Sequence, residues 1–516
     1  MTQKLLSEKS ATIIAVFIAG LCSIIYELLI STTTSYFLGD SIKQFSITIG
    51  VYMAAMGVGS YLSKFFEQDI LSKFVAIELL LGTIGGMSVP ILYYFFEHLD
   101  RFDYQILTIT LIGLIGILTG LEVPLLARIM KQYYPLKVNL ANVLSLDYLG
   151  ALLATLLFPF LLLPFLGIFR SSILFGIVNI ALGLFILWFF SQHLSKKSKN
   201  RMQSIATLTI LAFLSLIVFT QPLLARWNDD AFTHRIIFSK QTPYQHLAVT
   251  KNKEDIRLYI NRIIQFSSLD EYRYHEALAL VPLNVTPRPK QVLVLGGGEG
   301  LLVREILKHP DIEQVTIVDL DEAVFQLGKE HQAIMALNEG ALTHPKVKLA
   351  AEDAFNFLDE SQEFYDLIIA DLPDPSNEAV ARLYSTYFFR LVQSRLSRYG
   401  IFATQASGVF HTNDAFWCII NTLKASQFDY VYPYHTYVPS FGDWGFAIAA
   451  NRLLDVENFK LDVPTRFVNT ESVARMFYFE KDLETEEYLE PNELDRPTLL
   501  EYYLKDWEVW SKERVK

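Results

Sequence analysis

The chain has 516 residues, of which 52% are hydrophobic and 19% are charged, and its formal net charge is −11 at pH 7. Its mean hydropathy of +0.28 is higher than soluble globular proteins usually reach, so part of the chain is expected to lie in lipid. The negative charge argues against a nucleic-acid partner, and the two distant cysteines, Cys22 and Cys418, indicate neither a disulfide framework nor a metal site.

Apolar segments dominate the first 222 residues. Each is close to the roughly 20 residues that an α-helix needs to cross the hydrocarbon core of a bilayer. One such segment would fit a signal peptide or a buried core helix, but seven in succession predict a polytopic α-helical membrane domain over residues 1–222. The segments are 11–31, 46–66, 74–96, 104–126, 142–167, 171–191 and 204–221.

Four acidic residues lie inside these apolar segments: Glu27, Glu78, Glu122 and Asp147. A charged side chain that faced lipid would be costly, so we expect all four to face the interior of the helix bundle. Two interpretations stay open at this point. One is an interhelical hydrogen bond near a helix end, and the other is a polar cavity that holds a cation.

Basic residues are concentrated at the N-terminus and in the loops after the second, fourth and sixth apolar segments. By the positive-inside rule this distribution places the N-terminus in the cytoplasm. Seven crossings would then place everything after residue 221 outside the cell. The nucleoside chemistry predicted below needs a cytosolic substrate, so we expect a multi-pass cell-membrane protein with a cytoplasmic catalytic domain, and the charge count conflicts with that expectation.

Strands and turns replace the apolar segments after residue 222. Short strands joined by polar turns such as KNKED predict a small β-subdomain over residues 229–285. Strands and amphipathic helices then alternate over residues 286–450, the pattern of a doubly wound, mainly parallel, Rossmann-like α/β sheet. Residues 451–516 are predicted to pack on this domain as a helical tail, in which NELDRPTLLEYYLKDWEVW forms a docking helix.

A glycine-rich turn, GGGEG, follows the first strand of the predicted α/β sheet. Gly296 and Gly298 allow the backbone to approach a ligand closely. Asp319 ends the next strand about twenty residues on, where an acid accepts hydrogen bonds from ribose hydroxyls. Asp353, followed by Ala354, ends the third strand on the adenine side of such sites. A helix cap or a loop acid would explain either aspartate alone, but acids at consecutive strand ends predict a nucleoside site.

Three further carboxylates decide between nucleoside chemistries. The fourth strand ends in LIIADLPDP, which places Asp371 and Asp374 at its carboxyl end, where open α/β sheets bind ligands. Together with Glu299 of the glycine turn they converge where the sulfonium arm of an S-adenosyl nucleoside would lie. Ordinary S-adenosylmethionine carries a carboxylate there, which the cluster would repel. A decarboxylated nucleoside and an amine acceptor are both cationic, so the cluster favours these two reactants.

These motifs resemble the spermidine synthases, or polyamine aminopropyltransferases, over about residues 230–450, and the apolar half and the tail resemble their membrane-fused subgroup. The resemblance implies a catalytic acid at Asp371 and amine or acceptor contacts at Tyr274 and His275 of DEYRYHEAL and at Asp374. It also implies a set of nucleoside-binding positions: Gln245 of TPYQHL, Gly296, Gly298, Glu299, Asp319, Asp353 and Ala354.

Two positions depart from the family pattern and leave the acceptor open among putrescine, a longer polyamine and agmatine. Glu299 is one methylene longer than the aspartate usual in the glycine turn, which changes the pocket for the aminopropyl arm. The segment YVPSFGDWGF offers Phe441 where a tyrosine often meets the acceptor, and Trp444 either walls the site or packs in the core.

The resemblance implies an in-line displacement that moves the aminopropyl group of decarboxylated S-adenosylmethionine to an amine acceptor and releases methylthioadenosine. Asp371 would take the proton of the acceptor, with Tyr274 or a water, while His275 either supports the site by a hydrogen bond or contacts the acceptor. Decarboxylated S-adenosylmethionine is then a co-substrate, and neither a cofactor nor a metal is expected. The expected partners are these small molecules, the lipid bilayer and, by resemblance alone, a second copy of the chain.

Two other functions share part of this evidence. A small-molecule methyltransferase that uses S-adenosylmethionine would have the same glycine turn and Asp319, but has less use for DLPDP and Glu299. A polyamine transporter or sensor would bind ligand in its soluble domain without chemistry, and the intact pair Asp371 and Asp374 argues against it.

Overall fold

The computed structural model describes residues 2–38, 41–96, 98–220, 234–242, 244–456, 458–485 and 488–513. The chain divides into two compact units, Met1–Thr233 and His234–Lys516. The predicted end of the membrane domain at residue 222 and the predicted start of the β-subdomain at residue 229 lie outside the described residues.

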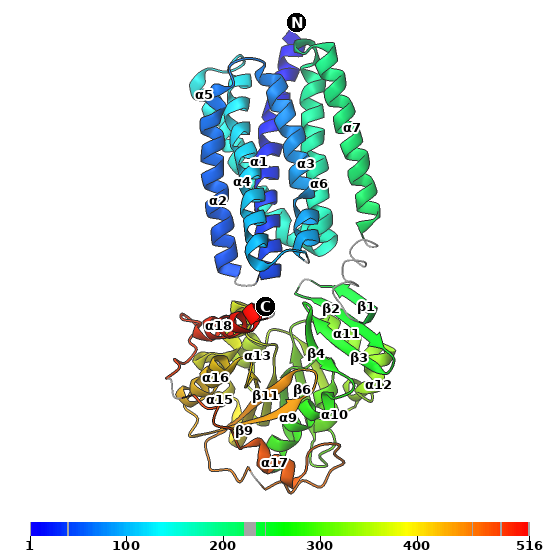
Figure 1. Cartoon of the computed structure of the whole chain (residues 1–516), viewed down its shortest axis with the longest axis vertical. Helices are drawn as coiled ribbons and strands as arrows, with labels where there is room; N and C mark the ends of the chain where they lie inside the picture. The colour runs from blue at the N-terminus through cyan, green and yellow to red at the C-terminus, as the bar shows by residue number, and fades with distance from the viewer. Residues whose placement is uncertain are drawn as a thin grey trace. The chain divides into compact units, whose positions relative to one another are not determined.

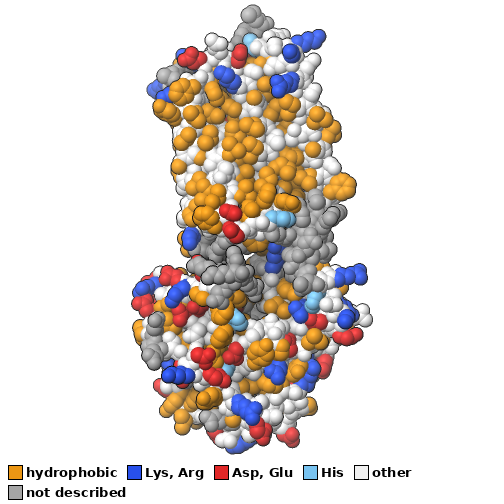
Figure 2. All heavy atoms as spheres, viewed as in Figure 1, with side chains coloured by type: hydrophobic (Ala, Val, Ile, Leu, Met, Phe, Trp, Pro, Cys, Tyr) orange, Lys and Arg blue, Asp and Glu red, His pale blue; other side chains and the backbone are white. Residues whose placement is uncertain are grey.

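The described part of the first unit consists of long helices packed side by side (Figure 1). Large hydrophobic side chains such as Phe160, Trp188 and Leu208 are exposed on its surface, and the face seen in Figure 2 is mostly hydrophobic between its two ends. Six helical runs are long and apolar enough to cross a membrane. The α-helices are α1 (Thr2–Leu38), α2 (Ser41–Leu62), α3 (Ile70–Phe96), α4 (Arg101–Met130), α5 (Leu136–Leu157), α6 (Leu163–Phe189) and α7 (Lys196–Val218).

The six runs correspond to the seven predicted segments, three of which were predicted to end one to three residues later, because Lys137–Phe189 is 53 residues long and covers two of them. At 1.5 Å per residue, a straight helix of that length would be far longer than a bilayer is thick. A π-helical turn, Phe158–Leu162, joins α5 to α6, and Gly167 leaves helical geometry with a φ of 72°. Only glycine adopts this φ without strain, so this residue is suited to the turn.

Contacts with α1 show that the chain reverses between α5 and α6. A Cβ on Gly150 of α5 would lie 2.3 Å from the carbonyl oxygen of Phe17, so these two helices touch through the glycine. Further along α1, the hydroxyl of Tyr26 donates to the carbonyl oxygen of Phe175 on α6 at 3.0 Å. The hydroxyl of Tyr133, just before α5, donates to the carboxylate of Glu8 near the start of α1 at 2.8 Å. Hence α5 runs parallel to α1, and α6 returns antiparallel to both as a separate segment (Figure 1).

The basic loops meet at the end of the bundle where α1 begins. The ammonium of Lys9 lies 4.2 Å from the ring centroid of Tyr134, and Arg128 donates to the carbonyl oxygen of Phe66 at 2.8 Å. Lys73 lies 5.1 Å from the ring of Phe66. The end of α7 lies at the opposite end of the bundle (Figure 1), so the conflict between the charge count and a cytoplasmic catalytic domain persists.

Of the four acidic residues in the apolar segments, all predicted to face the interior of the bundle, two are fully buried there. Glu78 and Glu122 are 0% and 1% exposed, whereas Glu27 and Asp147 are half-buried. Asn179 of α6 donates to the carboxylate of Glu78 on α3 at 2.7 Å. For Glu78 this confirms the interhelical hydrogen bond of the first interpretation, although Glu78 lies two turns inside α3 and not near a helix end.

The second unit begins with an antiparallel sheet of four strands in the order β1-β2-β3-β4, as the alternating pattern predicts. Val249, Leu258 and Phe266 are fully buried and pack against residues of the following α/β region, including Leu301 and Leu327. The strands are β1 (Arg235–Gln241), β2 (His246–Asn252), β3 (Asp255–Ile260) and β4 (Ile263–Ser267), and α9 (Glu271–Val285) follows them.

The larger sheet has seven strands in the order β10-β11-β9-β8-β5-β6-β7, and its strands from β9 to β7 are parallel. Its order reverses between β5 and β8, so the carboxyl ends of these two strands form the switch point where such sheets bind ligands. The strands are β5 (Gln291–Gly296), β6 (Gln314–Asp319), β7 (Val347–Ala351), β8 (Tyr365–Asp371), β9 (Leu396–Gly408), β10 (Tyr430–Val438) and β11 (Gly442–Ala450).

Helices cover both faces of this sheet (Figure 1). Along β5 the fully buried side chains alternate, with Val292 and Val294 in one core and Leu293 and Leu295 in the other, as the period of a strand requires. The helices are α10 (Leu301–Ile306), α11 (Glu322–Glu330), α12 (Gln332–Leu337), α13 (Ala354–Glu360), α14 (Glu378–Ala381), α15 (Thr386–Ser394), α16 (Asn413–Ala425), α17 (Thr470–Met476) and α18 (Thr498–Glu513).

The tail forms the predicted docking helix as α18. Leu499 is 0% exposed and belongs to the same core as β5 and α16, and Tyr503 is 5% exposed. Trp507, which has the same helical spacing, is 42% exposed, so the buried face is narrower than the spacing predicts. The indole of Trp510 donates to the carbonyl oxygen of His411 at 3.0 Å and ties the end of the helix to the segment that follows β9.

Candidate active site

The glycine turn brings three strand ends within contact distance. Gly296 and Gly297 have φ values of 86° and 63°, which other residues rarely adopt. A Cβ on Gly296 would lie 2.1 Å from the carbonyl oxygen of Asp371, and one on Gly298 would lie 2.7 Å from the carboxylate of Asp319. The absence of side chains at these positions therefore allows the ends of β5, β6 and β8 to converge.

Asp319 lies at the predicted place, at the end of β6 facing the glycine turn. Its carboxylate accepts hydrogen bonds from the backbone N–H of Gly298 at 3.1 Å and of Asp321 at 3.0 Å. Burial raises the pKa of Asp319 to about 6, against the lowering effect of these two hydrogen bonds. A half-buried carboxylate held in this way is positioned to accept from a ligand hydroxyl.

Gln245 reaches the same side of the site from the loop between β1 and β2. Its amide donates to the carboxylate of Asp321 at 3.1 Å, and the hydroxyl of Thr242 donates to the same oxygen at 2.6 Å. Asp321 also caps α11 by accepting from the N–H of Ala323. The role of Asp321 in linking the β-subdomain to the nucleoside side of the sheet was not predicted, because a DLD sequence does not show which aspartate faces the ligand.

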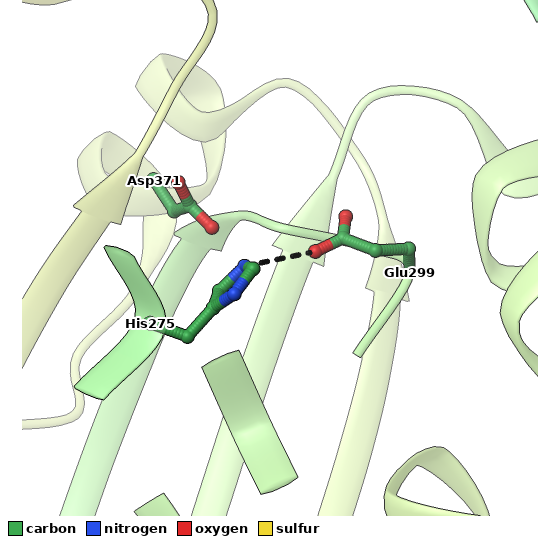
Figure 3. A group of neighbouring side chains, drawn as sticks. All are labelled: His275, Glu299 and Asp371. Carbon is green, nitrogen blue, oxygen red and sulfur yellow. Dashed lines mark ion pairs between the residues drawn. The ribbon is translucent and has the colours of Figure 1, made fainter. Parts of the chain in front are cut away.

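His275, Glu299 and Asp371 form a compact group at the switch point. The ligand-type atoms of these three side chains lie within 4.8 Å of one another, and Nε2 of His275 lies 3.8 Å from Oε1 of Glu299 (Figure 3). They come from α9, from the glycine turn and from the end of β8. The structure thus brings together the acids of GGGEG and DLPDP with the histidine of DEYRYHEAL, as the resemblance implies.

The carboxylates of Glu299 and Asp371 repel each other and are poorly solvated. Burial and the neighbouring carboxylate of Asp371 raise the pKa of Glu299 to about 7, although the charge of His275 opposes the shift. Burial also raises the pKa of Asp371, against the effects of His275 and of a hydrogen bond from Tyr274. The site is therefore suited to a positively charged ligand, which would restore the ionised form of both acids.

Tyr274 is placed to act on Asp371 directly. Its hydroxyl donates to Oδ1 of Asp371 at 2.6 Å, and its ring is 7% exposed. Its ring centroid lies 6.0 Å from that of Phe441, which in turn lies 5.2 Å from that of Trp444. These contacts place Phe441 beside the site, and Trp444 packs behind it as a half-buried member of the core.

The side chain of His275 is held in place by a buried ion pair beneath it. Its Nδ1 lies 2.8 Å from the carboxylate of Glu271, which Arg304 also contacts at 2.9 Å. Burial raises the pKa of Glu271, but hydrogen bonds from His275 and Arg304 outweigh it and lower the pKa to about 2. Burial alone would lower the pKa of His275, yet the surrounding carboxylates raise it above its ordinary value.

Asp374 has a contact that the sequence did not reveal. Its Oδ2 accepts a hydrogen bond from the hydroxyl of Tyr503, on α18, at 3.1 Å. Its Oδ1 is buried and has no hydrogen-bond partner among the described residues. Burial raises the pKa of Asp374 to about 6, and the hydroxyl groups of Ser407 and Tyr503 oppose the shift. Residues 129 positions apart cannot be paired from a single sequence.

Asp353 and Ala354 lie after β7, but the carboxylate of Asp353 already has protein partners. It caps α13 by accepting from the N–H of Phe355 at 3.0 Å, and it forms an ion pair with Arg382. The helix cap that the sequence left open as an explanation is therefore present. An adenine contact would use the edge of this segment, where Ala354 is 7% exposed, or would require Arg382 to move.

The spacing of His275, Glu299 and Asp371 would also suit a divalent metal ion, since each offers one ligand atom. Nδ1 of His275 is engaged by Glu271, so only Nε2 is free to face the group. An ammonium ion makes the same demand for negative oxygen atoms. The geometry therefore accepts either kind of cation.

Residues 271–458 match the family model of the spermine/spermidine synthase domain. The chain is 43% identical to a polyamine aminopropyltransferase of Leptospira interrogans over 505 residues, which cover 97% of this chain and 99% of that protein. It is 40% identical to polyamine aminopropyltransferase 2 of Ralstonia nicotianae over 501 residues, which cover 96% of this chain and 98% of that protein. The chain belongs to the polyamine aminopropyltransferase family.

The crystal structure of spermidine synthase from Thermotoga maritima is also similar to this aminopropyltransferase, with a TM-score of 0.43 and 22% identity. It covers 48% of this chain and 85% of that one. The family match confirms the predicted resemblance, and the full-length relatives extend it through the N-terminal helices. The matched domain includes the group of His275, Glu299 and Asp371, but Gln245 and Tyr503 lie outside it.

Proposed function

We propose that the protein transfers the aminopropyl group of decarboxylated S-adenosylmethionine to an amine acceptor such as putrescine and releases methylthioadenosine. The observation that carries this proposal is the convergence of Glu299, Asp371 and Asp319 on the glycine turn at the switch point of the sheet. The names of the full-length relatives favour aminopropyl transfer over a methyltransferase or a polyamine transporter or sensor.

The proposed site residues divide by the part of the reactants they meet. Asp319 accepts from the ribose, with Gly296, Gly298 and Gln245 beside it, and Asp353 and Ala354 lie on the adenine side. Glu299 binds the ammonium of the aminopropyl arm. The acceptor lies between Tyr274, His275 and Asp374, with its reacting amine near Asp371.

In the proposed reaction, the neutral nitrogen of the acceptor attacks the aminopropyl carbon bonded to sulfur. A C–N bond forms, the C–S bond breaks, and its electron pair neutralises the sulfonium as methylthioadenosine leaves. An ammonium ion has no lone pair, so the acceptor must first lose a proton, and Asp371 is placed to take it. The raised pKa of Asp371 makes it a better base, and Tyr274 keeps its carboxylate oriented by a 2.6 Å hydrogen bond.

Purified full-length protein, decarboxylated S-adenosylmethionine and a panel of amines test this proposal, with products identified by mass spectrometry. We expect an aminopropylated amine and methylthioadenosine in equal amounts. Asp371→Asn should abolish turnover and retain nucleoside binding, whereas Asp359→Asn, the same change at an exposed position, should leave turnover unchanged. Methyl transfer from S-adenosylmethionine, or full turnover by Asp371→Asn, would contradict the proposal.

We also propose that the helical unit spans the cell membrane and that the catalytic unit faces the cytoplasm, where the nucleoside is made. The six long apolar runs support the first statement, whereas the basic end of the bundle argues for the opposite orientation. Fusion of a fluorescent protein that folds only in the cytoplasm to the C-terminus tests the orientation. Fluorescence supports the proposal, and activity of an alkaline phosphatase fusion at the same site would contradict it.

A further inference from the structure

A helix outside the matched domain contributes a side chain to the acceptor end of the site. The matched domain ends at residue 458, and α18 begins at Thr498. Tyr503 of this helix is 5% exposed, and its hydroxyl donates to Oδ2 of Asp374 at 3.1 Å. A buried hydroxyl that donates to a carboxylate restricts the orientation of that carboxylate.

The second oxygen of Asp374 is left for a ligand. Oδ1 is buried without a hydrogen-bond partner among the described residues, and the neighbouring hydroxyl of Ser407 bonds with Thr412 at 2.9 Å. A buried carboxylate oxygen without a donor is unfavourable, since folding has removed its water. An ammonium group of the acceptor would supply the missing donor together with the opposite charge.

The position of Tyr503 is fixed by contacts one turn before it and one turn after it along α18. Leu499, one turn earlier, is fully buried in the core, and Asp506, one turn later, accepts from the N–H of Ala415 at 3.2 Å. Because neighbours along the helix are anchored, the hydroxyl of Tyr503 cannot follow Asp374 if that carboxylate moves. The hydrogen bond therefore sets where Asp374 lies.

We propose that Tyr503 is a positioning residue for the acceptor amine and favours a short diamine over a longer polyamine. Its hydroxyl occupies Oδ2 of Asp374, so that a single oxygen, Oδ1, faces the distal ammonium of the acceptor. Because the hydroxyl of Tyr503 contacts Oδ2 at 3.1 Å, its ring occupies the space on that side of Asp374 and would limit how far an acceptor chain extends past the carboxylate. The inference rests on the proposed aminopropyl transfer and on the placement of the acceptor at Asp374.

Loss of the hydroxyl has a consequence for pH dependence as well as for affinity. The hydrogen bond from Tyr503 favours the ionised carboxylate and keeps the pKa of Asp374 lower than burial alone would leave it. Without it the pKa of Asp374 should rise further above 6, and the carboxylate would be protonated over a wider pH range. A protonated Asp374 has no charge to attract an ammonium, so the weakening of acceptor binding should extend to higher pH.

Steady-state kinetics of the full-length protein and its Tyr503→Phe variant, with putrescine as acceptor, test the inference. Phenylalanine keeps the ring and its packing, so only the hydrogen bond is removed. We expect KM for putrescine to rise about tenfold at nearly constant kcat, as for the loss of a hydrogen bond to a charged group. The acidic limb of kcat/KM should move to higher pH. The matched control is Tyr502→Phe, a neighbour whose hydroxyl accepts from the N–H of Glu490 and does not contact Asp374.

A second variant, Tyr503→Ala, tests the effect of the ring, with spermidine compared against putrescine as acceptor. We expect the ratio of kcat/KM for spermidine to that for putrescine to increase, because the space beyond Asp374 is opened. Unchanged KM, pH profile and acceptor ratio in both variants would overturn the inference. If Asp374→Asn also left the KM for putrescine unchanged, the placement of the acceptor at Asp374 would fail. If the wild-type protein transferred no aminopropyl group, the proposed function itself would fail.

Discussion

Replacement of Glu299 by glutamine tests whether the acids of the site are held in an unfavourable charged state until a cation binds. Burial and Asp371 raise the pKa of Glu299 from its ordinary value of 4.5 to about 7 in the folded protein. Between these two pH values the folded protein binds more protons than the unfolded chain, so stability falls as pH rises through this window. Above pH 7 the full loss is present, and below pH 4.5 it is absent.

The size of the effect follows from the shift. A difference of 2.5 pKa units corresponds to about 3 kcal/mol of stability lost at pH 8 when Glu299 is ionised. Glutamine has nearly the same shape and no charge, so Glu299→Gln should recover most of this amount. For a unit of this size the change corresponds to a rise of about 5 °C in the melting temperature.

Thermal unfolding of the full-length protein in detergent, followed by the transition of its catalytic unit at pH 5 and pH 8, measures the effect. Glu299→Gln should melt several degrees higher than the wild type at pH 8, and the difference should shrink toward pH 5. Glu305→Gln is the matched control, because the carboxylate of Glu305 is paired with Arg304 and Lys308 and its loss should lower the melting temperature. A Glu299→Gln variant that melts at or below the wild-type temperature at pH 8 would refute the reasoning.

Three further predictions concern the geometry of the site. Gly298→Ala places a Cβ 2.7 Å from the carboxylate of Asp319. Overpacking costs about 1–3 kcal/mol, so this substitution should weaken the binding of methylthioadenosine about tenfold or more. Isothermal calorimetry measures the affinity, and an unchanged affinity would contradict the prediction. Leu499→Ala removes a fully buried side chain from the inner face of α18 and should lower the stability of the catalytic unit by about 2–5 kcal/mol. A lower melting temperature measures this loss. An unchanged thermal transition would show that α18 is not docked. The value of kcat/KM for the amine should rise with pH between about 5 and 8. The pKa values of Asp374 and Glu299 are about 6 and about 7, and only the ionised acids attract cations. A flat pH profile would argue against the binding of amines by Asp374 and Glu299.

Local sequence signals were sufficient where the fold depends on local periodicity. The alternation of β5, with Val292 and Val294 on one face and Leu293 and Leu295 on the other, follows from a buried strand in a two-sided sheet. The glycine turn and Asp319 could be placed because a strand, a turn and the next strand end are separated by short, regular distances. The group of His275, Glu299 and Asp371 required a family resemblance, since α9 lies far from β8 in sequence.

The contacts that sequence reasoning missed depend on tertiary packing. Tyr503 looks like any core aromatic on an amphipathic helix, and only the docking of α18 shows that its hydroxyl meets Asp374. Arg382 could not be paired with Asp353 in advance, because the segment that follows β8 is irregular. In the helical unit, Gly120 of α4 contacts α2 at Met56 whereas Gly113 of the same helix has open space beside it, a difference that depends on packing between helices.

The comparison of two nucleosides tests the central electrostatic claim most directly. Equilibrium binding of decarboxylated S-adenosylmethionine and of S-adenosylmethionine to the full-length protein is measured at pH 8, above the pKa values of about 7 and about 6 for Glu299 and Asp374. We expect the decarboxylated nucleoside to bind at least about tenfold more tightly, because its arm is cationic and lacks the carboxylate that the acids repel. Equal binding, or tighter binding of S-adenosylmethionine, would contradict the claim that these carboxylates select a cationic partner.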